Sequence, residues 1–260
     1  MSVAAVSTGD VVRALDRVAG INALFGVDHE QRGAPGVGRW RSATELCRSD
    51  DPPVAELVGS VGEWLGTAER RVAASMVVLG YSARLVAPAV AVLLCDGILL
   101  DLRPDAVWWR YAAGEGFAVR LPAPAGWRSP AGFAALLDEW GRQVVDGHLR
   151  PVVGAVRRDV RVAEGLLWGN VASSLAGSLR MLALGGTVPL PACRAAGAVL
   201  LGYGPLRDAG VLTEFGGQLF FVRRSCCLYY RLPGGGLCGD CPLVDDTERE
   251  RQWARALTSG

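Results

Sequence analysis

The sequence predicts an α+β protein that is predominantly helical, with small antiparallel β pieces. Apolar residues recur at helical spacing over most of the chain. Two regions, near residues 98–121 and 218–232, are instead rich in β-branched and aromatic residues bounded by glycine, which is typical of short strands. At 260 residues, half of them hydrophobic, the chain is long enough to bury a substantial core without disulfides or metals.

The first third of the chain predicts helices. Asp10 is a candidate N-cap for a first helix, a second is expected after Pro53, and Thr67 is expected to cap a third. An apolar run from Leu85 to Cys95 is too short to span a bilayer, so we interpret it as a core helix and expect no transmembrane segment. The first ten residues lack the features of a signal peptide, which predicts a cytoplasmic protein.

The middle of the chain changes to strand-like patterns. Residues 98–102, 107–111 and 117–121 are predicted to form one small antiparallel sheet. A helix is expected to follow Ser129-Pro130. We divide the chain here into an N-terminal lobe of helices and a β-hairpin, residues 1–150, and a second helical lobe, residues 151–260, that carries the cysteine motif described below.

A long helix is predicted from Arg158 to Leu184, followed by a shorter one at 192–201. Three glycines interrupt the long helix, where each costs about 1 kcal/mol relative to alanine, so they predict close packing of another element or a cofactor. They are Gly165, Gly169 and Gly177. Asn170 is a buried polar candidate; an internal hydrogen bond that fixes helix packing is favoured over a contact with a functional site.

Four of the seven cysteines lie in one C-terminal segment with the spacing C-C-x10-C-x2-C. They are Cys226, Cys227, Cys238 and Cys241. Four thiolates suit a tetrahedral zinc ion or a [2Fe-2S] cluster, and disulfides are a third possibility that a reducing cytoplasm disfavours. Neighbouring side chains on a strand face opposite ways, so the adjacent pair requires a backbone kink and is unusual for zinc. Cys47, Cys95 and Cys193 are isolated and are interpreted as small core residues.

Elements around the motif are predicted as follows. Residues 218–224 form a strand leading into the cysteines, residues 228–232 form extended chain leading out, and the cysteine loop therefore hangs from a hairpin. A charged final helix, residues 248–257, is expected to close over the site with Trp253.

The motif resembles that of the ferric-siderophore reductase (FhuF-like) family, in which four C-terminal cysteines bind a [2Fe-2S] cluster. The stretches Leu167-Trp168-Gly169-Asn170-Val171-Ala172 and, more loosely, Tyr81 to Pro88 are also similar to that family. The resemblance implies that the four cysteines hold the cluster and carry one electron to Fe(III) in a siderophore, with the hydroxamate type favoured. A structural zinc module and a siderophore-binding protein without activity are the alternatives.

The motifs and charges of the sequence indicate which partners the protein needs. No flavin or nicotinamide motif is recognised, so an electron donor such as ferredoxin or a flavoprotein reductase is expected. Arg223, Arg224 and Arg231 flank the motif and either steer an acidic donor or form a solvated charge set. The net charge of +1 gives no sign of nucleic-acid binding.

The substrate pocket is not identified by the sequence. Candidates by chemistry alone are Arg84, Trp109, Tyr229 and Tyr230, and ordinary packing explains each of them equally well. His29 and His148 have no partner motif and are given no role; a histidine at a helix end such as His148 is expected to be solvated or to interact with the helix dipole.

Overall fold

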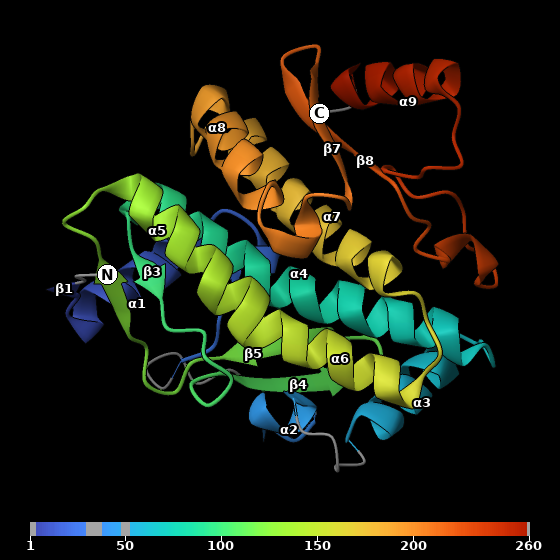
Figure 1. The fold of residues 1–260 in the computed structure, drawn as a ribbon, viewed down its shortest axis with the longest axis horizontal. Coiled ribbons are helices and arrows are strands. Elements are labelled where there is room, and N and C mark those ends of the chain that lie inside the picture. Colours follow the sequence, from blue (N-terminus) through green and yellow to red (C-terminus); the bar gives the residue numbers. More distant parts are fainter. Residues whose placement is uncertain (1–3, 30–37, 48–52, 259–260) are drawn as a thin grey trace.

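The computed structural model describes residues 4–29, 38–47 and 53–258 and has the predicted α+β fold, mostly helical with small antiparallel sheets (Figure 1). The helices are α1 (Thr8–Ala19), α2 (Thr44–Cys47), α3 (Pro53–Trp64), α4 (Arg70–Asp96), α5 (Phe133–Trp140), α6 (Arg150–Asp159), α7 (Glu164–Leu184), α8 (Leu190–Leu201) and α9 (Asp246–Thr258). A π-helical segment, η2 (Gly141–Leu149), joins α5 to α6, and short 3-10 turns are η1 (Ala23–Phe25), η3 (Gly204–Leu206) and η4 (Tyr229–Arg231).

The strands form three small antiparallel sheets. Their members are β1 (Ala4–Ala5), β2 (Arg41–Ser42), β3 (Leu99–Leu100), β4 (Trp108–Ala112), β5 (Gly116–Arg120), β6 (Gly126–Arg128), β7 (Gly210–Phe215) and β8 (Gln218–Arg223). The sheet orders are β1-β6-β3, β2-β4-β5 and β7-β8. The prediction of one sheet from residues 98–121 is therefore wrong in part, because β3 pairs with β6 while β4 and β5 pair with each other.

The core is built around α4 and α7, which make the most extensive contact between two helices among the described residues. Helix α4 is apolar on nearly all sides, as expected of a helix surrounded by protein. By length and composition it is long enough to cross a membrane, yet 72% of its most apolar window is buried inside the protein. The predicted core helix at Leu85 to Cys95 is the second half of α4.

Two pairs of polar side chains lie within this apolar contact between α4 and α7. Ser82 Oγ of α4 and Ser174 Oγ of α7 lie 3.0 Å apart, and both side chains are buried. Nearer the N-terminus of both helices, Ser75 Oγ of α4 accepts a hydrogen bond from Asn170 Nδ2 of α7. Such buried pairs fix the register of two helices because a shift would leave each polar group without a partner.

Three predicted helix boundaries need correction. The side chain of Ser7, not Asp10, caps α1 by accepting a hydrogen bond from the Asp10 backbone N–H. Thr67 does not cap α4 as predicted, because the helix begins after Glu69 and has no side-chain cap, and the Thr67 hydroxyl accepts from the Glu69 N–H outside the helix. The helix predicted from Arg158 to Leu184 is two helices, because the chain is extended at Val160 before α7 begins at Glu164. Helix α5, the π-helical segment η2 and helix α6 form one continuous helical rod beside α4 (Figure 1). Arg150-Pro151 therefore lies within a helical stretch. The division into lobes at this point stays a prediction.

His148 is a core residue and not a solvated one. It has no exposed surface, the Tyr81 hydroxyl lies 2.7 Å from Nε2, and the Leu102 carbonyl oxygen lies 2.5 Å from Nδ1. Burial lowers the pKa of His148 from 6.5 to about 4, so the folded protein holds it neutral. His29 is also buried, with Nε2 3.3 Å from an Asp16 carboxylate oxygen.

We predict a pH-dependent loss of stability that originates at His148. Above pH 6.5 the residue is neutral in both folded and unfolded chains, whereas between pH 6.5 and 4 only the unfolded chain takes up the proton. The free energy of unfolding should fall by about 2 kcal/mol between pH 7 and pH 5 for this reason. Urea unfolding of the wild type and of His148→Gln at pH 7 and at pH 5 isolates the effect, since the variant has no imidazole to titrate. Parallel pH profiles for the two proteins would contradict the assignment.

Candidate metal centre

The cysteine segment begins where β8 leaves the sheet. Strand β8 pairs along its length with β7, from Phe215↔Gln218 to Gly210↔Arg223, so the β7-β8 hairpin fixes the starting point of the cysteine loop, residues 224–242. The predicted hairpin is thus present, but its second strand is β7 and not residues 228–232. Those residues were expected to be extended, but the three at their centre, Tyr229–Arg231, form the 3-10 turn η4.

A backbone kink at Leu228 follows the adjacent cysteines and separates them from η4. Leu228 has φ of 68°, the left-handed conformation that residues other than glycine rarely adopt, and no other non-glycine residue in the described ranges has it. The backbone N–H groups of Leu228 and Tyr229 lie 3.3 and 3.5 Å from the sulfur atoms of Cys226 and Cys227. The kink therefore directs main-chain donors at both thiols, where they would stabilise thiolates.

The second pair of cysteines lies on a tight turn. The Cys241 N–H donates to the Cys238 carbonyl oxygen at 3.1 Å, and the Cys238 sulfur lies 3.6 Å from that of Cys227. Two thiolates on one tetrahedral metal, each about 2.3 Å from it, would be separated by roughly 3.8 Å. The structure thus brings Cys227 and Cys238 together at a separation that suits a shared metal ion.

Cys226 and Cys241 lie on the same loop but do not complete the arrangement. Across the part of the chain that the structure describes, no three His, Cys, Asp or Glu side chains are gathered as a closed metal site. The hydrogen bond with Cys238 and the Tyr229 N–H lower the pKa of Cys227 to about 6. The same contact raises the pKa of Cys238, while burial raises the pKa of Cys226.

The loop is attached to α4 and α7 by a buried chain of hydrogen bonds. Ser75 Oγ donates to the Cys227 carbonyl oxygen at 2.6 Å, and Asn170 Nδ2 donates to Ser75 O and Oγ at 2.7 and 2.9 Å. Arg223 Nη2 donates to Asn170 Oδ1. Ser75, Asn170 and Arg223 are all at most 2% exposed. Asn170 therefore does both things considered for it, since it joins two helices and also holds the loop.

Gly169 explains why this helix face can approach the loop closely. A Cβ atom at this position would lie 2.5 Å from Ser225 Oγ and 3.2 Å from Arg223 Nη2. Ser225 Oγ in turn donates to the Gly165 carbonyl oxygen at 3.0 Å. The predicted role of glycines in close packing is confirmed at Gly169, whereas a Cβ at Gly165 or Gly177 would meet nothing within 4 Å.

Asp240, between Cys238 and Cys241, attaches the far end of the loop. Its backbone carbonyl accepts a hydrogen bond of 3.1 Å from the Arg223 N–H, and its carboxylate accepts one from Ser173 Oγ on α7. Arg223 Nε lies 3.8 Å from the same carboxylate. Sequence reasoning did not single out Asp240; its place within C-x2-C was the available signal.

The three arginines near the motif do not form an open cationic surface. Arg223 is buried in the network just described. Arg224 pairs with Asp208 at 3.3 Å, and Arg231 donates from Nε and Nη2 to Glu69 at 2.9 and 2.7 Å. Their charges are thus largely compensated within the protein, which weakens the interpretation that they steer an acidic donor.

Two of the four substrate candidates have structural roles. Arg84 donates to the carbonyl oxygens of Phe117 and Ala23 at 2.7 and 2.6 Å, and Trp109 is 3% exposed. Tyr229 and Tyr230 are 42% and 43% exposed on η4, and one residue, Leu228, separates them from Cys227. Only the two tyrosines therefore combine exposure with closeness to the cysteine loop.

Residues 223–243 match one family model, described as the FhuF 2Fe-2S C-terminal domain. The cysteine segment is therefore of FhuF type. The match implies a [2Fe-2S] cluster, and it contains all four cysteines of the motif together with Arg223 and Asp240. A search of curated proteins returns no match to the chain. The residues of the segment fit such a cluster, because it offers four thiols with backbone N–H groups directed at two of them.

We predict that Gly169→Ala displaces the FhuF loop. The added methyl group would overlap Ser225 Oγ, at a cost of about 2 kcal/mol and a fall in Tm of about 4–8 °C. Iron and acid-labile sulfide per chain should fall with it. Gly177→Ala on the same helix is the matched control, because its methyl group meets open space and should be neutral or slightly stabilising. Equal iron content in both variants would show that the close approach at Gly169 does not matter.

We predict that Arg223 raises the reduction potential of the bound cluster. Its positive charge acts against the burial that raises the pKa of Cys226, and the same attraction favours the extra electron on a cluster held there. Arg223→Gln should lower the midpoint potential by on the order of 50 mV, equivalent to about 1 kcal/mol for one electron. Arg223→Lys, which retains the charge, should lie much closer to the wild type. Redox titration followed by EPR measures both, and a potential unaffected by Gln would refute the charge effect.

Proposed function

We propose that the protein is an iron-sulfur oxidoreductase that reduces Fe(III) bound to a siderophore, releasing Fe(II) in the cytoplasm. The observation that carries the proposal is the FhuF match over the cysteine loop. The proposed cluster ligands are Cys226, Cys227, Cys238 and Cys241. A bound [2Fe-2S] cluster would supply a centre that accepts and donates one electron at a time.

The residues of the chain have separate tasks in this proposal. The four thiolates would hold the cluster, and the N–H groups of Leu228 and Tyr229 offset their charge. Ser75, Asn170 and Asp240 hold the loop on α4 and α7 so that the thiols keep their spacing. Cys226, which is half-buried, and the exposed Tyr229 and Tyr230 leave one side of the loop accessible to a partner.

In this proposal the substrate undergoes a one-electron reduction. Fe(III) is a hard cation held by hydroxamate oxygens, and one electron converts it to Fe(II), which binds those oxygens more weakly. No covalent bond of the siderophore breaks, and the freed oxygens take protons from water. The electron would come from a separate donor, for which a ferredoxin or a flavoprotein reductase is suitable. A cytoplasmic location fits because reducing conditions keep the thiols available as ligands.

The test is low-temperature EPR of anaerobically purified protein after dithionite reduction. We expect a spin-half signal of a reduced [2Fe-2S] centre, and its loss in Cys226→Ser and Cys238→Ser. Cys47→Ser removes a half-buried thiol outside the motif and serves as the control, with the signal retained.

The reduced protein is then mixed with a ferric trishydroxamate in the presence of a coloured Fe(II) chelator. Fe(II) should form in proportion to the cluster, and only in proteins that show the EPR signal. Stoichiometric zinc with no EPR signal would make the site a structural zinc module. A normal signal without Fe(II) formation would leave an electron carrier that does not reduce siderophores.

A further inference from the structure

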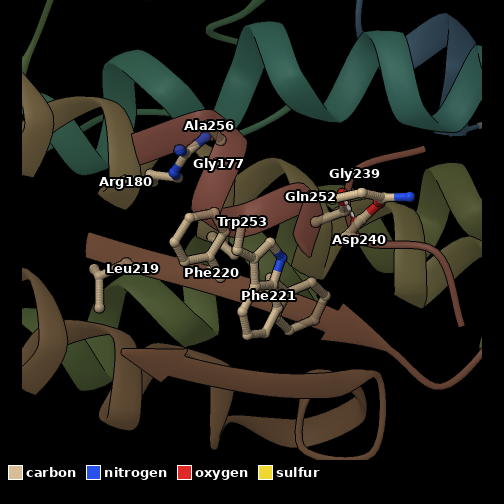
Figure 2. Close-up of a pocket in the computed structure, with 12 residues that line it drawn as sticks. Gly177, Arg180, Leu219, Phe220, Phe221, Gly239, Asp240, Gln252, Trp253 and Ala256 are labelled. Carbon is tan, nitrogen blue, oxygen red and sulfur yellow. Dashed lines mark hydrogen bonds between the residues drawn. The ribbon is translucent and has the colours of Figure 1, made fainter. Parts of the chain in front are cut away.

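A cavity of about 270 Å³ lies against the cysteine loop, enclosed by α7, β8 and α9. Gly239 and Asp240, the two residues between Cys238 and Cys241, form part of its wall (Figure 2). Gly239 is exposed, and a Cβ atom there would meet nothing within 4 Å. A molecule in this cavity can therefore approach the backbone of the cysteine turn without a side chain in between.

One wall of the cavity is made of aromatic side chains that pack against one another. The rings of Phe220 on β8 and Trp253 on α9 are stacked, with centroids 4.7 Å apart and planes 23° from parallel. Phe215 packs edge-on against Phe220 and tilted against Trp253. As expected from the sequence, α9 brings Trp253 close to the cysteine segment, and Figure 2 shows it facing the Phe220 and Phe221 side chains. Apolar groups of a ligand would be buried against this surface.

Two side chains that line the cavity also carry hydrogen-bond donors without partners. The Arg180 guanidinium lies 4.5 Å over the Phe220 ring and donates from Nη2 to Gln218 Oε1 at 3.0 Å. Arg180 Nε and Trp253 Nε1 are buried and have no hydrogen-bond partner in the part of the chain that the structure describes. Buried N–H groups are normally paired, so these two point to a ligand that brings oxygen atoms.

We infer that this cavity binds one arm of the ferric chelate, with the arm's apolar part on Phe220 and Trp253 and its carbonyl or hydroxamate oxygens on Arg180. The inference rests on the proposed function and adds the substrate site to it. Pockets that enclose drug-sized ligands measure about 300–1,000 Å³, so this cavity holds a part of such a chelate. The iron then lies at the rim formed by Gly239 and Asp240, beside the Cys238–Cys241 turn.

Binding can be tested apart from electron transfer by using a gallium(III) trishydroxamate. Gallium(III) has the charge of Fe(III) but is not reduced, so calorimetry on the cluster-loaded full chain measures affinity alone. Arg180→Gln should raise Kd roughly tenfold or more through loss of a charge-assisted hydrogen bond. Arg180→Lys, which keeps the charge without the planar donors, should give a smaller increase. Trp253→Leu should also weaken binding.

The matched control is Arg194→Gln. Arg194 lies on α8, its side chain is 61% exposed, and it pairs with Glu214 at 3.1 Å outside the cavity, so Kd should not change. Arg180→Gln is expected to fold, because the wild-type side chain makes one hydrogen bond to the half-buried Gln218. The Tm of each variant is measured beside its Kd.

Unchanged affinity in both Arg180→Gln and Trp253→Leu overturns the inference, and so does a wild type that fails to bind the gallium complex. EPR of the same samples separates this failure from that of the proposed function. A normal reduced-cluster signal with Fe(II) formation, but no change in Kd in either Arg180→Gln or Trp253→Leu, rejects the cavity alone. Absence of the signal from the wild type rejects the proposed function, and the substrate site with it.

Discussion

The position of the cysteine loop depends on the buried amide of Asn170. This side chain donates to Ser75 on α4 and accepts from Arg223 at the end of β8, while Ser75 itself donates to the Cys227 carbonyl. Every member of this chain is buried and satisfies another, so removal of one leaves an unpaired polar group in the core. The loop is therefore held by the α4–α7 contact as well as by the β7-β8 hairpin at which it begins.

Sequence reasoning found the elements whose residues carry a clear period or chemistry. Helices α3, α8 and α9, strands β4, β5 and β8, and the four-cysteine segment were all predicted near their observed places. Boundaries failed where no local signal exists. The chain is extended at Val160 without a nearby glycine or proline, and β7 pairs with β8 where the sequence offered residues 228–232 as the alternative.

The interior of the site was the least predictable part. An arginine beside an anionic centre is normally solvated, so the sequence pointed to Arg223 on the surface, and only tertiary packing against Asn170 and Asp240 buries it. Leu228 has a left-handed backbone conformation, which glycine usually adopts, and a leucine in the sequence gives no signal for this conformation. Asp240 links two parts of the molecule, because it holds the loop on α7 and also forms a wall of the cavity next to α9.

The way the loop is attached affects what happens to the protein when it loses the cluster. The anchors of the loop lie on α4 and α7, whose apolar residues form a hydrophobic core that includes none of the four motif cysteines. Loss of iron by oxidation should therefore release the loop without unfolding the chain, since the core does not need the metal. The folded helices would keep the anchoring groups in place, so that a lost cluster could be replaced on the same polypeptide.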